Sequence, residues 1–157
     1  MKTKFLLLLL LAFSIKAFSQ DKSDPEYETV YIVIAGTSSD YNYLEDKSKN
    51  ISKNTNISFD NGGMQFDQKR GMIVPDTSSD ELYAGGYYPR RFPEERISIE
   101  MLWYYKDGQN EETSKDMIII TGIFGNKKDA EKQLDRIKEL VPTAYIKKKQ
   151  MYMGCMH

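Results

Sequence analysis

The sequence of 157 residues contains one cysteine and one histidine. With Cys155 alone, no disulfide can form within the chain, so a small disulfide-stabilised scaffold is excluded. The sole histidine, His157, follows that cysteine by two residues at the end of the sequence, so a serine nucleophile elsewhere lacks a histidine base. The glycine pairs Gly62-Gly63 and Gly85-Gly86 indicate turns and do not form a phosphate-binding loop. We therefore expect a non-enzymatic protein that needs no cofactor.

Long apolar runs are absent except at residues 5–13, near the start of the chain. A basic start and small residues before a cleavage point complete the pattern: Lys2, Lys4, Ala17 and Ser19. This predicts a signal peptide over residues 1–19, cleaved before Gln20. The apolar run is shorter than the roughly 20 residues that span a bilayer. The mature protein is expected to be periplasmic or secreted, with no membrane span.

A strongly basic surface is also absent. Three of the 22 lysines and arginines precede residue 20, which leaves 19 against 23 acidic residues and a net charge of −4. Nucleic acids and anionic membrane surfaces need a concentrated basic face, so neither is an expected partner. The only dense basic run, residues 147–149, is expected to protect the edge of a sheet.

Residues 116–149 have the clearest local pattern, a strand, a helix and a second strand. Residues 117–121 are a β-rich apolar run that ends at Gly122. Asn126 is placed to cap the helix, and Pro142 would stop it. Its inward face is predicted from residues at helical spacing: Ala130, Leu134, Ile137 and Val141.

The same pattern begins in the first half of the chain. Residues 20–28 are polar and contain Pro25, which predicts a flexible lead-in. Residues 29–35 are then predicted to form a strand, followed by Gly36 and a helix that begins near Asp40 as its cap. The inward positions of this helix match those of the later helix at a constant offset: Leu44, Ser48 and Ile51. The match indicates a duplicated β-α-β unit.

Two such units normally combine as βαββαβ. We therefore predict an α+β, ferredoxin-like fold over residues 29–157, with an antiparallel sheet and both helices on one face. Residues 97–105 are predicted to be the closing strand of the first unit. Residues 54–96 then form an insertion after the first helix.

Within the insertion, residues 57–59 and 64–66 are predicted to form a hairpin around Asp60-Asn61-Gly62-Gly63. Residues 30–35 and 117–120 are apolar without alternation, as in strands that are buried on both faces. The insertion is therefore expected to cover the face that the helices leave open.

The two halves resemble the SPOR domain, a sporulation-related repeat of bacterial cell-envelope proteins. The similarity rests on residues 33–38 in the first half, and on residues 120–124 with the Asp129-Ala130-Glu131 helix start in the second. It implies a βαββαβ fold and binding of peptidoglycan strands without stem peptides. At sheet positions where typical members carry glutamine or arginine, this chain has Ile34, Ile118 and Ile120. Any glycan contact is therefore expected elsewhere.

The end of the insertion, residues 83–93, combines aromatic side chains with two arginines. Aromatic faces stack on sugar rings, and arginine binds carboxylates through two hydrogen bonds. The candidate ligand-binding residues are Tyr83, Tyr87, Tyr88, Arg90, Arg91 and Tyr104. The alternative is that this segment packs over the sheet, with its arginines paired to Glu94, Glu95 or Glu100.

The sequence thus predicts an exported binding module for peptidoglycan or another cell-envelope glycan. The alternative is a structural protein that binds an envelope protein and no glycan. A third interpretation is soft-metal binding by the tail, whose sulfur and imidazole groups suit Cu(I). The tail residues concerned are Met151, Met153, Cys155, Met156 and His157. Because Met and Cys more often pack in cores, no metal site is assigned.

Overall fold

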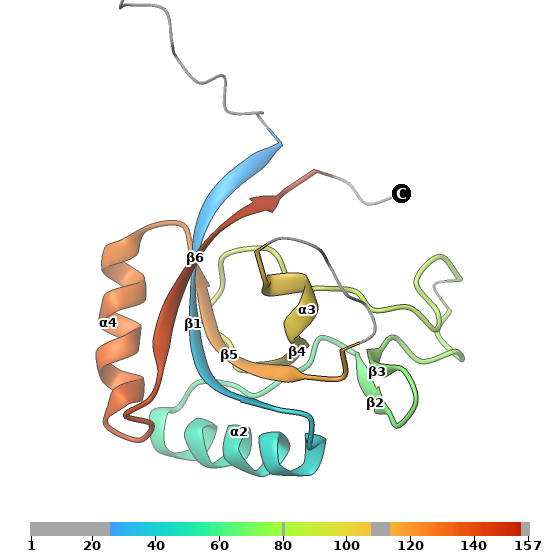
Figure 1. Ribbon diagram of the computed structural model, residues 1–157, viewed down its shortest axis with the longest axis horizontal. Helices are drawn as coiled ribbons and strands as arrows, with labels where there is room; N and C mark the ends of the chain where they lie inside the picture. Colours follow the sequence, from blue (N-terminus) through green and yellow to red (C-terminus); the bar gives the residue numbers. More distant parts are fainter. Residues whose placement is uncertain (1–25, 80, 108–113, 155–157) are drawn as a thin grey trace, which may run out of the picture.

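The computed structural model describes residues 26–79, 81–107 and 114–154, which form an α+β domain. The elements are β1 (Tyr27–Ser38), α2 (Tyr41–Thr55), β2 (Gln65–Asp67), β3 (Gly71–Ile73), β4 (Ser98–Met101), α3 (Leu102–Tyr105), β5 (Met117–Phe124), α4 (Lys127–Lys138) and β6 (Tyr145–Tyr152). Four strands make an antiparallel sheet in the order β4-β5-β1-β6, and β2 pairs separately with β3 (Figure 1). The predicted α+β class is confirmed, and the sheet is compatible with a ferredoxin-like fold. The predicted signal peptide lies outside the described residues.

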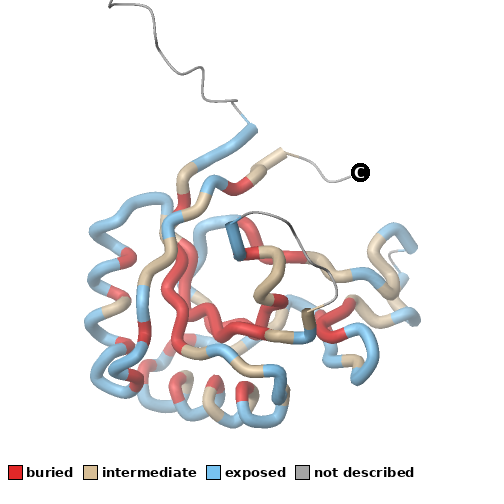
Figure 2. Tube along the Cα trace, viewed as in Figure 1, coloured by how far each residue is buried: buried red, intermediate tan, exposed pale blue. Residues whose placement is uncertain are grey.

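β1 and β5 are neighbours in the middle of the sheet, as their apolar character predicts. Residues 32–35 and 117–123 are buried at every position. Because successive strand residues point to opposite faces, both faces of these strands are covered. Figure 2 shows the buried residues gathered along the middle of the sheet.

The helices α2 and α4 cover one face of the sheet. Each begins at the predicted cap: the Asp40 side chain accepts from the Tyr43 N–H at 3.1 Å, and the Asn126 side chain from the Asp129 N–H at 3.0 Å. Buried residues of both helices and of the strands β1, β4 and β5 belong to one apolar cluster, which includes Leu44, Ile51, Ala130, Ile137, Val33, Ala35, Ile99, Met101, Met117 and Ile119.

The inward face of α4 differs from the prediction at two positions. Ala130 and Ile137 are buried as expected, but Leu134 is only partly buried. Gln133 is buried instead, and its side chain donates to the Thr121 carbonyl at 3.2 Å. The helix ends at Lys138, so Val141 packs against the core from beyond the helix.

The second face of the sheet is covered by α3 and by the chain around Arg90 (Figure 1). The apolar cluster on this face consists of Val30, Ile32, Ile34, Tyr105, Ile118, Ile120, Ile123 and Met151. The Tyr105 hydroxyl donates to the Arg90 carbonyl at 2.6 Å and so joins the two parts of the cover. The last part of the insertion therefore contributes to this face, as expected.

The predicted strand over residues 97–105 is wrong beyond Met101. The Leu102 N–H bonds to the Asp116 carbonyl at 2.9 Å, and the chain then turns into α3. This single turn places Tyr105 against the sheet, where its large ring is fully buried. Burial of the ring, which removes a large apolar area from water, outweighs the β propensity of the aromatic run.

The predicted hairpin is wrong in its pairing, although its turn is present. Gly62 and Gly63 have φ angles of 65° and 82°, which favour glycine. The segment before the turn does not pair with the segment after it, because Phe59 forms a parallel bridge with Ile97. The hairpin that forms instead is β2 with β3.

β1 begins earlier than predicted, at Tyr27, which pairs with Tyr152 of β6. The end of the predicted lead-in is therefore part of the sheet. None of the helices among the described residues has the length and apolar character needed to cross a bilayer.

Candidate ligand-binding site

The structure brings the four candidate tyrosines together in two pairs. The ring centroids of Tyr83 and Tyr88 lie 4.5 Å apart, edge to face. Those of Tyr87 and Tyr104 lie 6.2 Å apart, in a similar orientation. Tyr104 belongs to α3, and the Lys149 ammonium lies 5.5 Å from its ring centroid. The predicted aromatic surface is thus divided between the insertion and α3.

Arg91 connects the insertion to the end of β6. Its side chain donates to the carbonyls of Tyr152 and Gly154 at 3.0 and 2.9 Å. The residue is buried, and its guanidinium also lies 5.5 Å from the ring centroid of Phe92. The Arg91 side chain therefore donates to the protein's own backbone at the end of β6. This agrees with the alternative interpretation, in which residues 83–93 pack against the domain.

Arg90 is buried beside β4 and donates to three acceptors of the chain around it. One terminal nitrogen donates to the Arg96 carbonyl at 2.6 Å and to the Ser98 hydroxyl at 3.3 Å. The other donates to the Glu94 carbonyl. The predicted pairing with Glu94 is also present, with the Arg90 Nε 3.7 Å from the carboxylate.

Glu100 lies on β4 and is buried on the second face of the sheet, since it pairs with Ile118. The Ser98 hydroxyl donates to its carboxylate at 2.9 Å, and the Tyr87 hydroxyl donates at 2.7 Å. The Tyr87 oxygen also accepts the Met101 N–H at 3.2 Å. A continuous polar network therefore holds the insertion against β4.

Burial governs the electrostatics of this network. It raises the pKa of the Glu100 carboxyl, while hydrogen bonds from Tyr87 and Ser98 act in the opposite direction. Burial, followed by the Glu100 charge, raises the pKa of Tyr87. Burial, followed by the charge of Arg96, lowers the pKa of Arg90. The surroundings thus disfavour isolated charge of either sign.

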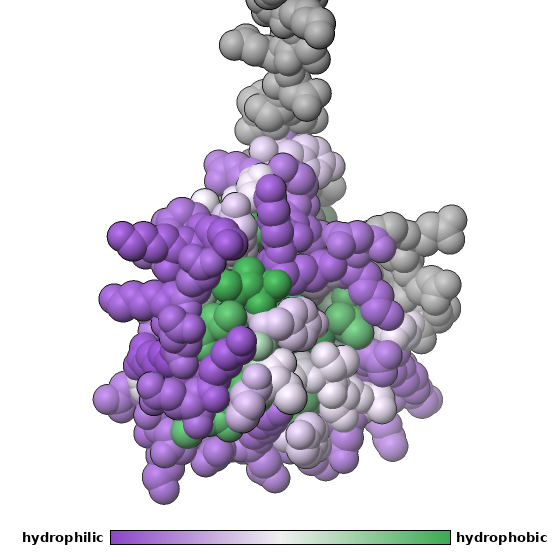
Figure 3. All heavy atoms as spheres, turned by 60° about the vertical axis from the view of Figure 1, so that its left-hand side comes forward, coloured by the Kyte–Doolittle hydropathy of each residue, from purple (hydrophilic) through white to green (hydrophobic). Residues whose placement is uncertain are grey.

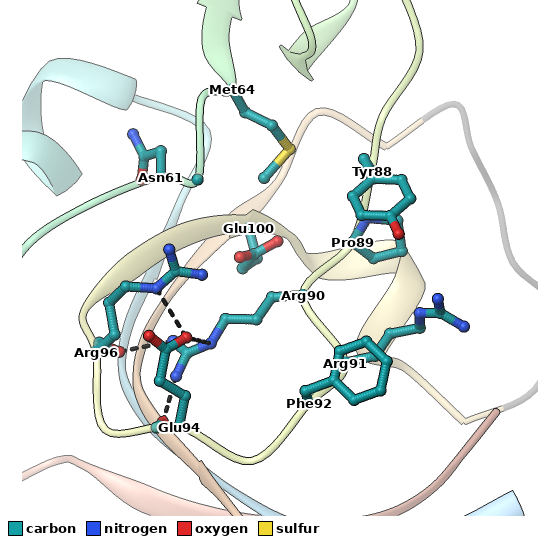
Figure 4. A pocket seen from close by; sticks show the side chains of 11 residues that line it. Asn61, Met64, Tyr88, Pro89, Arg90, Arg91, Phe92, Glu94, Arg96 and Glu100 are labelled. Atoms are coloured by element: carbon teal, nitrogen blue, oxygen red, sulfur yellow. Dashed lines mark hydrogen bonds and ion pairs between the residues drawn. The ribbon is translucent and has the colours of Figure 1, made fainter. Parts of the chain in front are cut away.

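A pocket of about 180 Å³ opens above this network, and we call it the arginine pocket. It is lined by Asn61, Gly62, Met64, Tyr88, Pro89, Arg90, Arg91, Phe92, Glu94, Arg96 and Glu100. Figure 4 shows the side chains of Arg90, Glu94 and Arg96 meeting in the pocket, while Arg91 points away from them. Of the two predicted arginines, Arg90 is therefore the one whose guanidinium faces this space.

Glu94 and Arg96 complete the arginine pocket. From the sequence, Glu94 was predicted only as a pairing partner, and Arg96 was not singled out. The Arg96 side chain lies 3.2 Å from the Glu94 carboxylate and 3.3 Å from that of Asp60. The available signal was the alternating charge of Arg90, Glu94 and Arg96, which lie four and two residues apart.

A second hollow, of about 620 Å³, shares the lining residues Tyr88 and Gly62 with the arginine pocket. We call it the tyrosine groove. It is lined by Gly62, Gly63, Val74, Pro75, Thr77, Ser78, Ser79, Tyr83 and Tyr88. Among the described residues that line it, none is charged. The polar loop that follows Pro75 contributes hydroxyl groups that the sequence analysis did not assign to a site.

The C-terminal tail is described only as far as Gly154, so Cys155, Met156 and His157 lie outside the described residues. Met151 is buried, and Met153 packs against the same apolar cluster. No group of three or more potential metal-ligating side chains of the His, Cys, Asp and Glu types occurs among the described residues. Soft-metal binding by the tail therefore stays a prediction.

The surface on the side of α4 differs from the groove. Figure 3 shows hydrophilic residues surrounding a limited central area of apolar and near-neutral residues. The hollow recorded near this helix is lined mainly by charged and polar side chains: Glu95, Asp129, Lys132, Gln133 and Arg136, with Phe124. The described residues that line this hollow include one aromatic ring and no hydroxyl group, whereas the tyrosine groove has an edge-to-face tyrosine pair beside hydroxyl groups.

No family model matches the chain, and neither a curated protein nor a solved structure was found that matches it. The resemblance to SPOR domains therefore stays a prediction.

Proposed function

We propose that the protein is a non-enzymatic, exported binding module that recognises a cell-envelope glycan such as peptidoglycan through the tyrosine groove. The observation that carries this proposal is the groove itself, with Tyr83 and Tyr88 beside the loop of Thr77, Ser78 and Ser79. Export is supported by the signal-peptide pattern of residues 1–19.

The composition of the groove favours an uncharged, polar and flat ligand. A sugar ring presents a C–H face that packs on an aromatic ring, and hydroxyl groups at its rim. Tyrosine supplies such a packing surface with few side-chain torsions to order. Serine and threonine hydroxyls both donate and accept hydrogen bonds.

The proposed site differs from the open sheet face that a SPOR domain would use. Ile34, Ile118 and Ile120 are buried in the apolar cluster under α3, where no glycan can reach them. The strand order β4-β5-β1-β6, with α2 and α4 as crossovers, supports a ferredoxin-like and SPOR-like topology. We infer that the fold is retained and that the binding surface lies on the insertion.

A pull-down on purified peptidoglycan, with and without amidase treatment that removes stem peptides, tests this proposal. We expect the wild-type protein to be retained, and more strongly after the treatment. Tyr88→Ala should reduce retention by about fivefold or more, the effect of losing a central aromatic contact. Tyr43→Ala is the matched control, since Tyr43 is 52% exposed on α2 and lines none of these hollows.

Thermal unfolding of each variant separates lost binding from lost folding. A folded Tyr88→Ala protein that is retained like the wild type would contradict glycan recognition by the groove. Absence of wild-type retention under both conditions would also contradict it, and the interaction-protein alternative would take its place.

A further inference from the structure

The arginine pocket contains two buried donors that make no hydrogen bond. These are the Nε atoms of Arg90 and Arg96. Both lie near one atom, the Glu94 Oε2, at 3.7 and 3.2 Å. Buried guanidinium N–H groups normally have partners, and leaving them unpaired is unfavourable. The two donors therefore mark a position that the protein's own carboxylate fills incompletely.

The exposure of the three side chains is uneven. The Arg90 side chain is 5% exposed and that of Arg96 is 20% exposed, whereas the Glu94 side chain is 51% exposed. The arginines form the wall of the pocket, and the glutamate reaches it from the solvent side. An ion pair with a half-exposed partner is weaker than a fully buried one, so the Glu94 side chain can be displaced.

The backbone of Glu94 explains its incomplete fit. Its N–H donates to the Ile123 carbonyl at 2.8 Å, and its carbonyl accepts the Ile123 N–H at 3.0 Å. The same carbonyl also accepts from Arg90. With its main chain fixed to β5, Glu94 brings a single oxygen near both Nε atoms. An unattached carboxylate has two oxygens and can give one to each donor.

We propose that the arginine pocket is a subsite for the carboxylate of a small ligand, which replaces the Glu94 side chain between Arg90 and Arg96. Glu94 acts as an internal occupant that keeps the two guanidiniums in place until the ligand arrives. Arg90 is held by the carbonyls of Arg96 and Glu94, so its Nε stays directed into the pocket.

The surroundings favour a monoanion of small size. The pocket volume of about 180 Å³ accommodates a carboxylate with a few further atoms. Glu100 is buried in the lining, and a second negative charge on the ligand would lie close to it. A carboxylate is planar like the guanidinium and suits its paired donors. Inorganic phosphate, with more charge, is therefore expected to bind less well.

This inference goes beyond glycan recognition and does not require it. The arginine pocket and the tyrosine groove share Tyr88, so a ligand with both a sugar ring and a carboxylate could occupy both. The test below uses a simple anion and no glycan. Its failure leaves the groove proposal standing, and failure of the groove proposal leaves this one standing.

The experiment is an NMR titration of the ¹⁵N-labelled protein with sodium acetate, at constant ionic strength set with sodium chloride. The arginine Nε–H signals report directly on the two donors. We expect saturable shifts of the Arg90 and Arg96 signals. Glu94→Gln should lower the half-saturating acetate concentration by about threefold to fivefold, because the displaced ion pair is weak. Arg96→Gln should raise it.

The matched control is Glu95→Gln. Glu95 is the next residue, is 48% exposed and pairs with Arg136 outside the pocket. The Glu95→Gln substitution removes the same charge as Glu94→Gln but from outside the pocket. It should therefore leave the acetate titration unchanged. An equal effect of Glu94→Gln and Glu95→Gln would overturn the proposal that acetate displaces Glu94. It would show only the general effect of removing one negative charge.

Other results would also overturn the proposal. Unsaturated or absent shifts in both the wild type and Glu94→Gln would show that acetate does not bind there. Equal half-saturation in these two proteins would show that Glu94 is not an occupant. Tighter binding of inorganic phosphate than of acetate would overturn the assignment to carboxylates.

Discussion

The two faces of the central sheet are buried by different chemistry. On one face, α2 and α4 place apolar side chains such as Leu44 and Ile137 against the strands. On the other face, α3 and the end of the insertion cover an apolar cluster, but Ser98 and Glu100 of β4 lie beneath them. The second cover is joined to the sheet by hydrogen bonds as well as by apolar contact.

The two covers of the sheet differ not only in polarity but also in how closely their interactions fix the position of the chain. Apolar packing is non-directional and depends mainly on the area removed from water. A buried hydrogen-bond network is satisfied in few arrangements and therefore fixes the position of the segments that form it. The network of Arg90, Glu100 and Tyr87 thus holds the insertion in the one register that shapes the arginine pocket.

Breaking the polar cover should have the largest effect on stability. Arg90→Met keeps much of the aliphatic stem but takes the Arg90 donor from the Arg96 carbonyl, and it leaves the Glu94 carbonyl with only the Ile123 N–H. We expect the free energy of unfolding to fall by about 3–5 kcal/mol, the usual range for removing one member of a buried charged network. Urea denaturation measures this change.

The control for this prediction is Arg136→Met, which removes an exposed arginine paired with Glu95. Such a surface pair contributes about 0–1 kcal/mol. Similar losses for the two variants would show that the polar cover is no more important to stability than a surface pair.

The apolar cover is tested by two truncations within α4. Ile137 is fully buried, whereas Leu134 is partly buried. Ile137→Ala should lower the free energy of unfolding by about 2–5 kcal/mol, since it leaves a cavity in the core. Leu134→Ala should cost less, because part of that side chain already contacts water. Equal losses in chemical denaturation would mean that the helix packs in a different rotation.

The smallest expected effect is a pH dependence of the polar cover. Burial raises the pKa of Glu100 above its ordinary value of 4.5, so the folded state holds this proton more tightly than the unfolded state. The stability from this group is fully present below 4.5 and is lost as the pH rises through the folded-state pKa. Glu100→Gln should therefore gain stability relative to the wild type as the pH rises from 4.5 to the folded-state pKa of Glu100.

Urea midpoints measured at several pH values for both proteins give this difference, in which the other titrating groups cancel. Glu95→Gln, an exposed change of the same kind, should follow the wild type. Parallel profiles for the wild type and Glu100→Gln would contradict a raised pKa for Glu100.

The same contrast explains what the sequence could predict. The strands β1 and β5, the caps Asp40 and Asn126, and most inward helix positions follow from local patterns of polarity and spacing. These patterns act within a few residues, so the sequence displays them directly. The apolar runs also predicted that both faces of the sheet are buried.

The polar cover could not be predicted in the same way. α3 is a four-residue aromatic turn, too short for helical and strand periodicity to be distinguished. The acceptors of Arg91 lie 61 and 63 residues away along the chain, and no local pattern encodes such a partner. The sequence singled out Arg90 and Arg91 as candidates, but their internal partners and the contacts of Arg96 depend on the tertiary structure.

The position of β1 in the sheet has a consequence for how the chain folds. Among the described strands β1 is synthesised first, yet both of its neighbours, β5 and β6, come from the last part of the described chain. Tyr27 pairs with Tyr152 at the far end of the domain. Such non-local pairing slows folding, because long loops must close before the contacts form. The N-terminal half alone cannot assemble the central sheet, so the domain folds only after nearly the whole chain has emerged.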